Sequence, residues 1–146
     1  MLEDVAVGGE IYDTDFATYR ADADLAWRAR LMGHRGFYCH RAVARHRRVV
    51  LPERRRSLPR AYNAMSVRNR FLMRIKNEGP GLLARNGLHE IARDAMVVGY
   101  VLLREWSSIP ALADVLRLMP RTLAKRREIQ ARRRVRDSEL ARWFSG

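Results

Sequence analysis

Residues 60–106 decide the fold class of this chain: RAYNAMSVRNRFLMRIKNEGPGLLARNGLHEIARDAMVVGYVLLREW. From about Arg60 to Asn77, apolar residues recur among basic ones at helical rather than alternating spacing, and the pattern stops at the turn-forming residues 78–81. From about residue 82 to residue 106, apolar residues step by three or four: Leu88, Ile91, Ala95, Val98, Leu102 and Trp106. We therefore predict two long helices, the second with an apolar stripe that needs a partner surface.

The residues after position 106 predict more helix. Two serines and Pro110 supply the polar cap and early proline of a third helix, and Pro120 is expected to start or kink the next one. Eight basic residues lie between positions 121 and 136, and a new helix cap is expected at Asp137 or Ser138. No internal repeat is visible.

The residues before position 60 are more irregular. We predict that residues 51–59, LPERRRSLP, form an exposed connector and the main boundary of the chain, because prolines flank a run of charges. GFYCH and AVARH carry β-forming residues, so short strands or extended segments are expected near 36–40 and 42–47. Residues 22–32 are good helix formers that end at Gly33, a natural glycine position after a helix. The predicted fold class is mainly α with a few short β-strands.

Charge is unevenly distributed in a chain of globular composition. The 146 residues are 47% apolar and 31% charged, which favours one folded unit over disorder. The net charge is +13, yet the first 24 residues hold seven acids and a single arginine. We call residues 1–24 the acidic head, and we expect it to have a different role from the basic remainder.

Several classes of protein are excluded or disfavoured. The start, MLEDVAVGG, is acidic and lacks the basic and apolar regions of a secretory signal. The longest apolar run, residues 95–103, has nine residues, whereas a membrane-spanning helix needs about 20. A single cysteine, Cys39, cannot form an internal disulfide and fits a reducing compartment. We expect a cytoplasmic protein.

Two aspartates open the predicted helix in residues 19–34, YRADADLAWRARLMGH. Acids in a first turn favour the helix dipole, and Asp24 lies four residues before Arg28, which suits an ion pair. Alternatively, one carboxylate beside a pocket acts as a general base toward a hydroxyl nucleophile. Because Asp22 and Asp24 are two residues apart and point in different directions, they cannot both do so.

Other chemistry is thinly represented. The four histidines are too far apart for a compact metal motif, and no phosphate-loop, dinucleotide-binding or CxxC motif occurs. Arginine clusters at 45–48, 54–56 and 125–134 are solvated helix faces or contacts to polyanions such as nucleic acid, anionic lipid or a diphosphate. A basic helical module for nucleic acid and a noncatalytic scaffold that docks on a partner enzyme are therefore alternatives.

Read as one string, residues 12–46, YDTDFATYRADADLAWRARLMGHRGFYCHRAVARH, resemble the acceptor-side half of family 2 glycosyltransferases, inverting enzymes with the GT-A fold. In that family a segment FDExFFxYxEDxDLxxRxxxxG precedes a strand, an alanine-valine pair and a histidine. Residues 66–77, SVRNRFLMRIKN, resemble the family's RNRxxxxxKN helix. The tail from Leu118 is similar to that of rhamnosyltransferase-like members. The matching positions in the first segment are Asp13, Asp15, Phe16, Tyr19, Asp22, Asp24, Leu25, Arg28, Gly33, Tyr38, Ala42, Val43 and His46.

The resemblance implies site residues and cofactors. Asp22 matches the proposed general base, which deprotonates the acceptor hydroxyl, and Asp24 and Arg28 are its supports or a helix pair. His46 matches a position that can complete a divalent metal site, for Mg²⁺ or Mn²⁺, that holds the diphosphate of a nucleotide-sugar donor. The implied acceptor is a polysaccharide or a lipid-linked acceptor, and the implied location is peripheral, on an anionic membrane surface at the inner face.

Two departures from the family shape the expectation. Ala21 stands where the family usually has glutamate, and the family's N-terminal half, a nucleotide-binding βα region with a DxD metal motif, has no counterpart here. We therefore expect residues 1–50 to be an acceptor-side remnant of the GT-A domain, and residues 51–146 a basic helical extension. The remnant should have a poorly supported acidic head and exposed apolar surface around residues 5–45. We expect the chain to be inactive alone and to be either a fragment of a longer reading frame or a subunit that docks a separate donor-binding half.

Overall fold

Helices dominate the computed structural model, which describes residues 2–45 and 58–143. The α-helices are α1 (Ala21–Leu31), α2 (Arg60–Asn77), α3 (Pro80–Arg104), α4 (Ile109–Arg132) and α5 (Asp137–Leu140). Within the described ranges, short 3-10 turns lie before, between or after these helices: η1 (Thr14–Phe16), η3 (Trp106–Ser108) and η4 (Ala141–Trp143). The prediction of a mainly α protein is confirmed.

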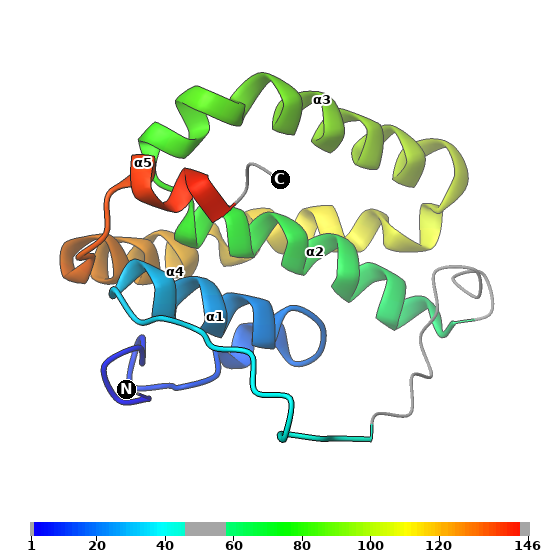
Figure 1. Cartoon of the computed structure of the whole chain (residues 1–146). Helices are drawn as coiled ribbons and strands as arrows, with labels where there is room; N and C mark the ends of the chain where they lie inside the picture. The colour runs from blue at the N-terminus through cyan, green and yellow to red at the C-terminus, as the bar shows by residue number, and fades with distance from the viewer. Residues whose placement is uncertain (1, 46–57, 144–146) are drawn as a thin grey trace.

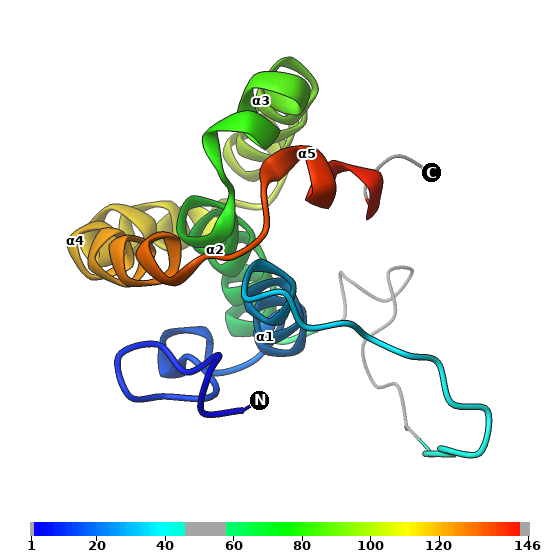
Figure 2. The same cartoon turned by 60° about the vertical axis from the view of Figure 1, so that its left-hand side comes forward.

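Helix α2 is the centre of the molecule (Figure 1). It packs against α4, with α1 and the N-terminal segment on one side and α3 on the other, as the turned view in Figure 2 also shows. Leu72 and Met73 of α2 join Phe16 and Val115 in one apolar cluster. A second cluster joins Val5, Val7, Leu31, Met32, Leu82, Ile129, Leu140 and Ala141, which come from both ends of the chain. Described residues on both sides of the predicted boundary near residue 50 thus share apolar clusters, and the boundary itself lies outside the described residues.

Of the two alternatives predicted near residues 36–40 and 42–47, short strands or extended segments, the strands are wrong for the described residues. Residues 36–45 contain no strand, and positions 46 and 47 lie outside the described residues. Within the described ranges the only β pairing is an isolated bridge between Val7 and Glu10. A strand satisfies its backbone groups only when a neighbouring strand pairs with it, and the described part of this chain offers none.

Pro120 does not start a new helix, because α4 continues through this residue. Proline removes one backbone hydrogen bond from a helix interior. Pro120 lies on the exposed side of α4, so water can reach the carbonyl that loses its partner. Thr122 on the next turn donates its hydroxyl to the carbonyl of Leu118 at 2.9 Å.

Candidate functional site

A buried group of charged side chains joins the N-terminal segment, α1 and α2. Lys76 of α2 donates its ammonium group to Asp13 at 2.5 Å and lies 2.9 Å from Asp24 of α1. Asp24 also accepts a hydrogen bond from Arg28 at 2.9 Å and one from Asn77 at 2.6 Å. Asp24, Arg28 and Asn77 are completely buried. We call these five residues the buried charge network. It holds α1 against the last turn of α2.

Asp13 extends this network to α4. Its other carboxylate oxygen accepts from Lys125 at 2.5 Å, and Lys125 also donates to Asp15 at 2.7 Å. Burial by itself would raise the pKa of Asp13, but the two lysines outweigh burial and lower that pKa to about 2. Burial would lower the pKa of Lys125, and the hydrogen bonds to the two aspartates raise it. The acidic head is therefore firmly held, and the expectation that it would be poorly supported is wrong.

The segment just before Asp22 has an unusual backbone. Ala17, Tyr19 and Arg20 have φ angles of 49°, 61° and 65°, in a region that residues with a side chain rarely adopt. Asn69 of α2 holds this segment with its side-chain amide, because it donates to three backbone carbonyls, those of residues 16, 18 and 19, at 2.6–3.0 Å. Arg68 donates to the carbonyl of Asp15 at 2.6 Å. The RNR stretch of α2 thus fixes the chain that leads to Asp22.

Asp22 lies in the same helical turn as Asp24 but differs from it in solvent exposure and in its partners. It is exposed in the first turn of α1, and its carboxylate accepts a hydrogen bond from the backbone N–H of Ala23 at 2.8 Å. Among the described residues, no cation forms an ion pair with Asp22 within 4.0 Å. Its carboxylate is accessible to a ligand, whereas the carboxylate of Asp24 is enclosed by Arg28, Lys76 and Asn77.

Arg28 links α1 to the N-terminal segment. Besides its pair with Asp24, its guanidinium donates to the backbone carbonyls of Val5 and, at 2.7 Å, Ile11. The i,i+4 pairing that the spacing of Asp24 and Arg28 predicts is present in the structure. Both side chains act on the position of α1, and neither reaches solvent.

His46, the predicted metal ligand, lies outside the described residues. Within residues 2–45 and 58–143, no group of three histidine, cysteine or acidic side chains is arranged to hold a metal ion. His34 instead contacts Asp4, with 2.7 Å between its Nε2 and the carboxylate. The described residues alone do not provide a metal site, so the divalent metal stays a prediction from the resemblance.

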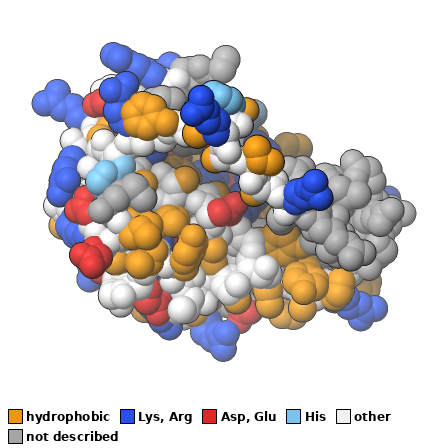
Figure 3. All heavy atoms as spheres, turned by 60° about the horizontal axis from the view of Figure 1, so that its bottom comes forward, with side chains coloured by type: hydrophobic (Ala, Val, Ile, Leu, Met, Phe, Trp, Pro, Cys, Tyr) orange, Lys and Arg blue, Asp and Glu red, His pale blue; other side chains and the backbone are white. Residues whose placement is uncertain are grey.

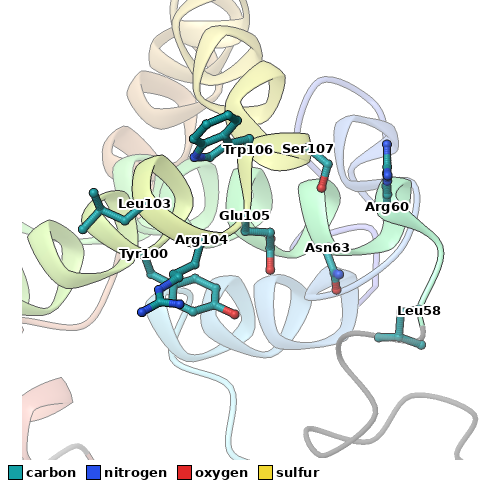
Figure 4. A pocket seen from close by; sticks show the side chains of 9 residues that line it. All are labelled: Leu58, Arg60, Asn63, Tyr100, Leu103, Arg104, Glu105, Trp106 and Ser107. Atoms are coloured by element: carbon teal, nitrogen blue, oxygen red, sulfur yellow. The ribbon is translucent and has the colours of Figure 1, made fainter.

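Three hollows lie along α2. The largest of the three, of about 970 Å³, lies between the start of α2 and the end of α3, and Asp22 is not among its lining residues (Figure 4). Tyr100 and Arg104 of α3 and Trp106 of the following turn project toward it (Figure 4). The two smaller hollows, of about 250 and 500 Å³, both include Arg20 in their linings. Asp22 lines neither hollow, but its charge acts on Arg20, which lines both.

The basic tail is largely occupied within the protein. Arg126 of α4 donates to two carbonyls at the end of α2, at 2.6 Å each, which is a favourable place for a cation. Arg132 donates to the carbonyls of Asp4 and Ala6, and Arg133 pairs with Asp137 at 2.5 Å. Several arginines of the cluster at 125–134, for which the sequence suggested contacts to a polyanion, instead hydrogen-bond to carbonyls at a helix end or to the acidic head.

Comparisons with protein families, with curated proteins and with solved structures found no match to this chain. No helix in the described ranges is long and apolar enough to cross a membrane.

Proposed function

We propose that this chain is the acceptor-side, C-terminal portion of an inverting family 2 glycosyltransferase of rhamnosyl or hexosyl type. The separation of Asp22 from Asp24 carries the proposal. One aspartate is exposed at the start of α1 on a fixed backbone, and the other is consumed by the buried charge network. A catalytic base must reach its substrate, and of the two only Asp22 can.

In this reaction an oxygen of Asp22 takes the proton of an acceptor hydroxyl. The hydroxyl oxygen attacks the anomeric carbon of the donor sugar, and the bond from that carbon to the nucleotide diphosphate breaks with inversion. The residues of this chain supply the base and its placement. The nucleotide-sugar and the divalent metal, whose site His46 would complete, would be held mainly by a donor-binding half, supplied by another chain or by further sequence, and this chain alone is inactive.

Exposed apolar residues support the existence of a docked partner half. Phe37, Tyr38 and Val43 are 83–94% exposed, although Val5, Val7 and Phe16 of the same region are buried. Figure 3 views the side that carries residues 34–45, and hydrophobic side chains lie open at several places on it. In the GT-A fold, β-forming residues after the acidic segment pair with strands of the other half. We assign residues 36–43 to that contact.

The proposal also assigns the outer face of α3 to an anionic membrane surface. Leu88 and Ile91 of the apolar stripe are 86% and 64% exposed, while Asp94 of the same helix turns toward arginines of α2. Exposed arginines of the same helix stand at positions 85, 93 and 104. An exposed apolar stripe with basic residues beside it suits binding in the headgroup region of anionic lipids.

Transfer activity tests the function. The upstream half is supplied by co-expression, and turnover of a nucleotide-sugar onto a lipid-linked or polysaccharide acceptor is measured with Mg²⁺ or Mn²⁺. We expect Asp22→Asn to lower kcat by about 10²–10⁴-fold with the fold intact, the range for loss of a general base. Asp114→Asn, which changes an exposed acid on α4, is the matched control and should retain activity. Full turnover by the Asp22→Asn complex would sink the base assignment.

A further inference from the structure

Three arginines from three elements surround the two smaller hollows beside α2. Arg20 comes from the turn before α1, Arg70 from α2 and Arg93 from α3, and all three line both hollows. The two hollows measure about 250 and 500 Å³. Three guanidinium groups around one concave surface are unusual, because like charges repel one another unless anions lie between them.

The acidic side chains near the two hollows already form ion pairs with Arg70 and Arg74 of α2. Asp94 accepts two hydrogen bonds from Arg70, at 2.9 and 3.0 Å, and is also paired with Arg74. Arg74 further binds Glu78 at 3.0 Å and Glu90 at 3.2 Å. Arg70 is thereby fixed in place, and the two acids that also line the smaller hollow, Glu78 and Glu90, are paired with Arg74.

Arg20 and Arg93 are left without an acidic partner among the described residues. In the described part of the chain, neither guanidinium has a hydrogen bond or an ion pair to a carboxylate. The pKa of Arg20 is lowered from its ordinary value, first by burial and then by the charges of Arg70 and Arg93, and the charge of Asp22 offsets this in part. An anion in the hollow would remove the repulsion and pair with both guanidinium groups.

Arg20 is also held in a defined position. Its backbone has a φ of 65°, and the carbonyl of the preceding residue, Tyr19, accepts from Asn69 at 3.0 Å. Strained backbone that a neighbouring element holds firmly is a common feature of ligand sites, since it pre-organises the binding group. The backbone at Arg20 is therefore fixed before a ligand arrives.

We propose that Arg20, Arg70 and Arg93 bind a phosphate group of the acceptor, which places the acceptor next to Asp22. Guanidinium groups bind phosphate through paired, charge-assisted hydrogen bonds, and a hollow of about 250 Å³ has room for a phosphate with part of a sugar. The identity of the ligand as an acceptor rests on the proposed function. The anion site itself does not, because it stands on the geometry of the three arginines.

Binding of inorganic phosphate to the whole chain tests the site, by calorimetry and by NMR of the arginine side chains. We expect Arg93→Gln and Arg20→Gln each to weaken binding about tenfold. Arg93 is exposed, so its loss leaves the fold intact even where the Arg20 variant is less stable. Arg127→Gln removes an exposed arginine from α4, away from the hollows, and is the matched control, with no loss expected. Absence of phosphate binding, or an equal loss in the Arg127 variant, overturns the site.

Two ligands identify the source of the phosphate. The chain is tested with phosphatidic acid in neutral vesicles and with glycerol phosphate in solution. If it binds phosphatidic acid more tightly, and this binding depends on Arg93 in the same way, the ligand is a lipid-linked phosphate. If it binds the two equally, the ligand is a phosphate on a soluble sugar. Phosphate binding without sugar transfer would contradict the glycosyltransferase proposal and leave the site standing. Transfer that Arg20→Gln and Arg93→Gln leave unchanged would remove the site and leave the function standing.

Discussion

At the scale of single residues, the same substitution at the two aspartates of α1 should change the free energy of unfolding by very different amounts. Asp24→Asn removes a charge that balances Arg28 and Lys76 in a buried place, so we expect a loss of about 3–5 kcal/mol in the free energy of unfolding. Asp22→Asn changes an exposed side chain and should stay within about 0.5 kcal/mol. Urea unfolding of both variants measures the difference. Equal losses would show that Asp22 is also structural.

Asp13 should make stability depend on acid. Its pKa in the folded protein is about 2, below the ordinary value of 3.8, so folding favours the ionised form. The stabilisation is complete above about pH 4 and is lost as the pH falls toward 2. In Asp13→Asn we expect a lower unfolding midpoint at neutral pH and a flatter pH dependence between pH 4 and 2. An unchanged acid slope would assign the acid sensitivity to other carboxylates.

Sequence spacing reveals only the local part of this network. The pair Asp24 and Arg28 is visible because four residues make one helical turn. The contacts of Asp13 with Lys76 and Lys125 span 63 and 112 positions, and nothing local marks either lysine as buried. Asn69 is similar: it stands in a stretch that resembles a family helix, but its three backbone acceptors are known only from the fold.

At the scale of elements, the sequence predicts helices well and strands poorly. The bounds predicted for α2 are those observed, and Gly33 follows α1 with a φ of 87°, as expected for a glycine after a helix. A helix satisfies its backbone within one segment, so its own sequence contains most of the signal. Residues 36–45 have β-forming side chains, yet pairing depends on a second strand that the described chain lacks. The spacing of apolar residues predicted the stripe of α3. It could not show that Leu88 and Ile91 of this stripe would face away from the other helices.

The start of α3 offers a test with two glycines of one helix. The side chain of Asp137 lies against this start and accepts a hydrogen bond from the N–H of Gly81 at 2.6 Å. A Cβ added to Gly81 would be 2.7 Å from the Cβ of Asp137, so Gly81→Ala should displace α5 and cost roughly 1–3 kcal/mol. Gly99 has open space around it, and Gly99→Ala should stabilise by about 0.5–1 kcal/mol. Chemical denaturation gives the sign of the change in the free energy of unfolding for both variants. A stabilising Gly81→Ala would contradict the close contact of Asp137 with the start of α3.

At the scale of the whole molecule, the acidic head and the basic remainder have one structural role together. Asp4, Asp13 and Asp15 are bound by basic side chains of α2, α4 and the residues that follow α4. The uneven charge of the sequence is thus neutralised across the fold. These contacts occupy many basic residues of the tail, and the alternative of a nucleic-acid-binding module stays a prediction.

The charge that remains, with the outward stripe of α3, predicts binding to anionic membranes. We expect the chain to cosediment with vesicles that contain phosphatidylglycerol and not with neutral vesicles, and binding should weaken as salt rises. Leu88→Gln with Ile91→Gln should reduce binding about tenfold, because two apolar side chains no longer enter the headgroup region. Leu116→Gln is the control, since Leu116 is 72% exposed but lies on α4. An equal loss in this control, or steeply salt-dependent binding to DNA without vesicle binding, would assign the basic surface to a different partner.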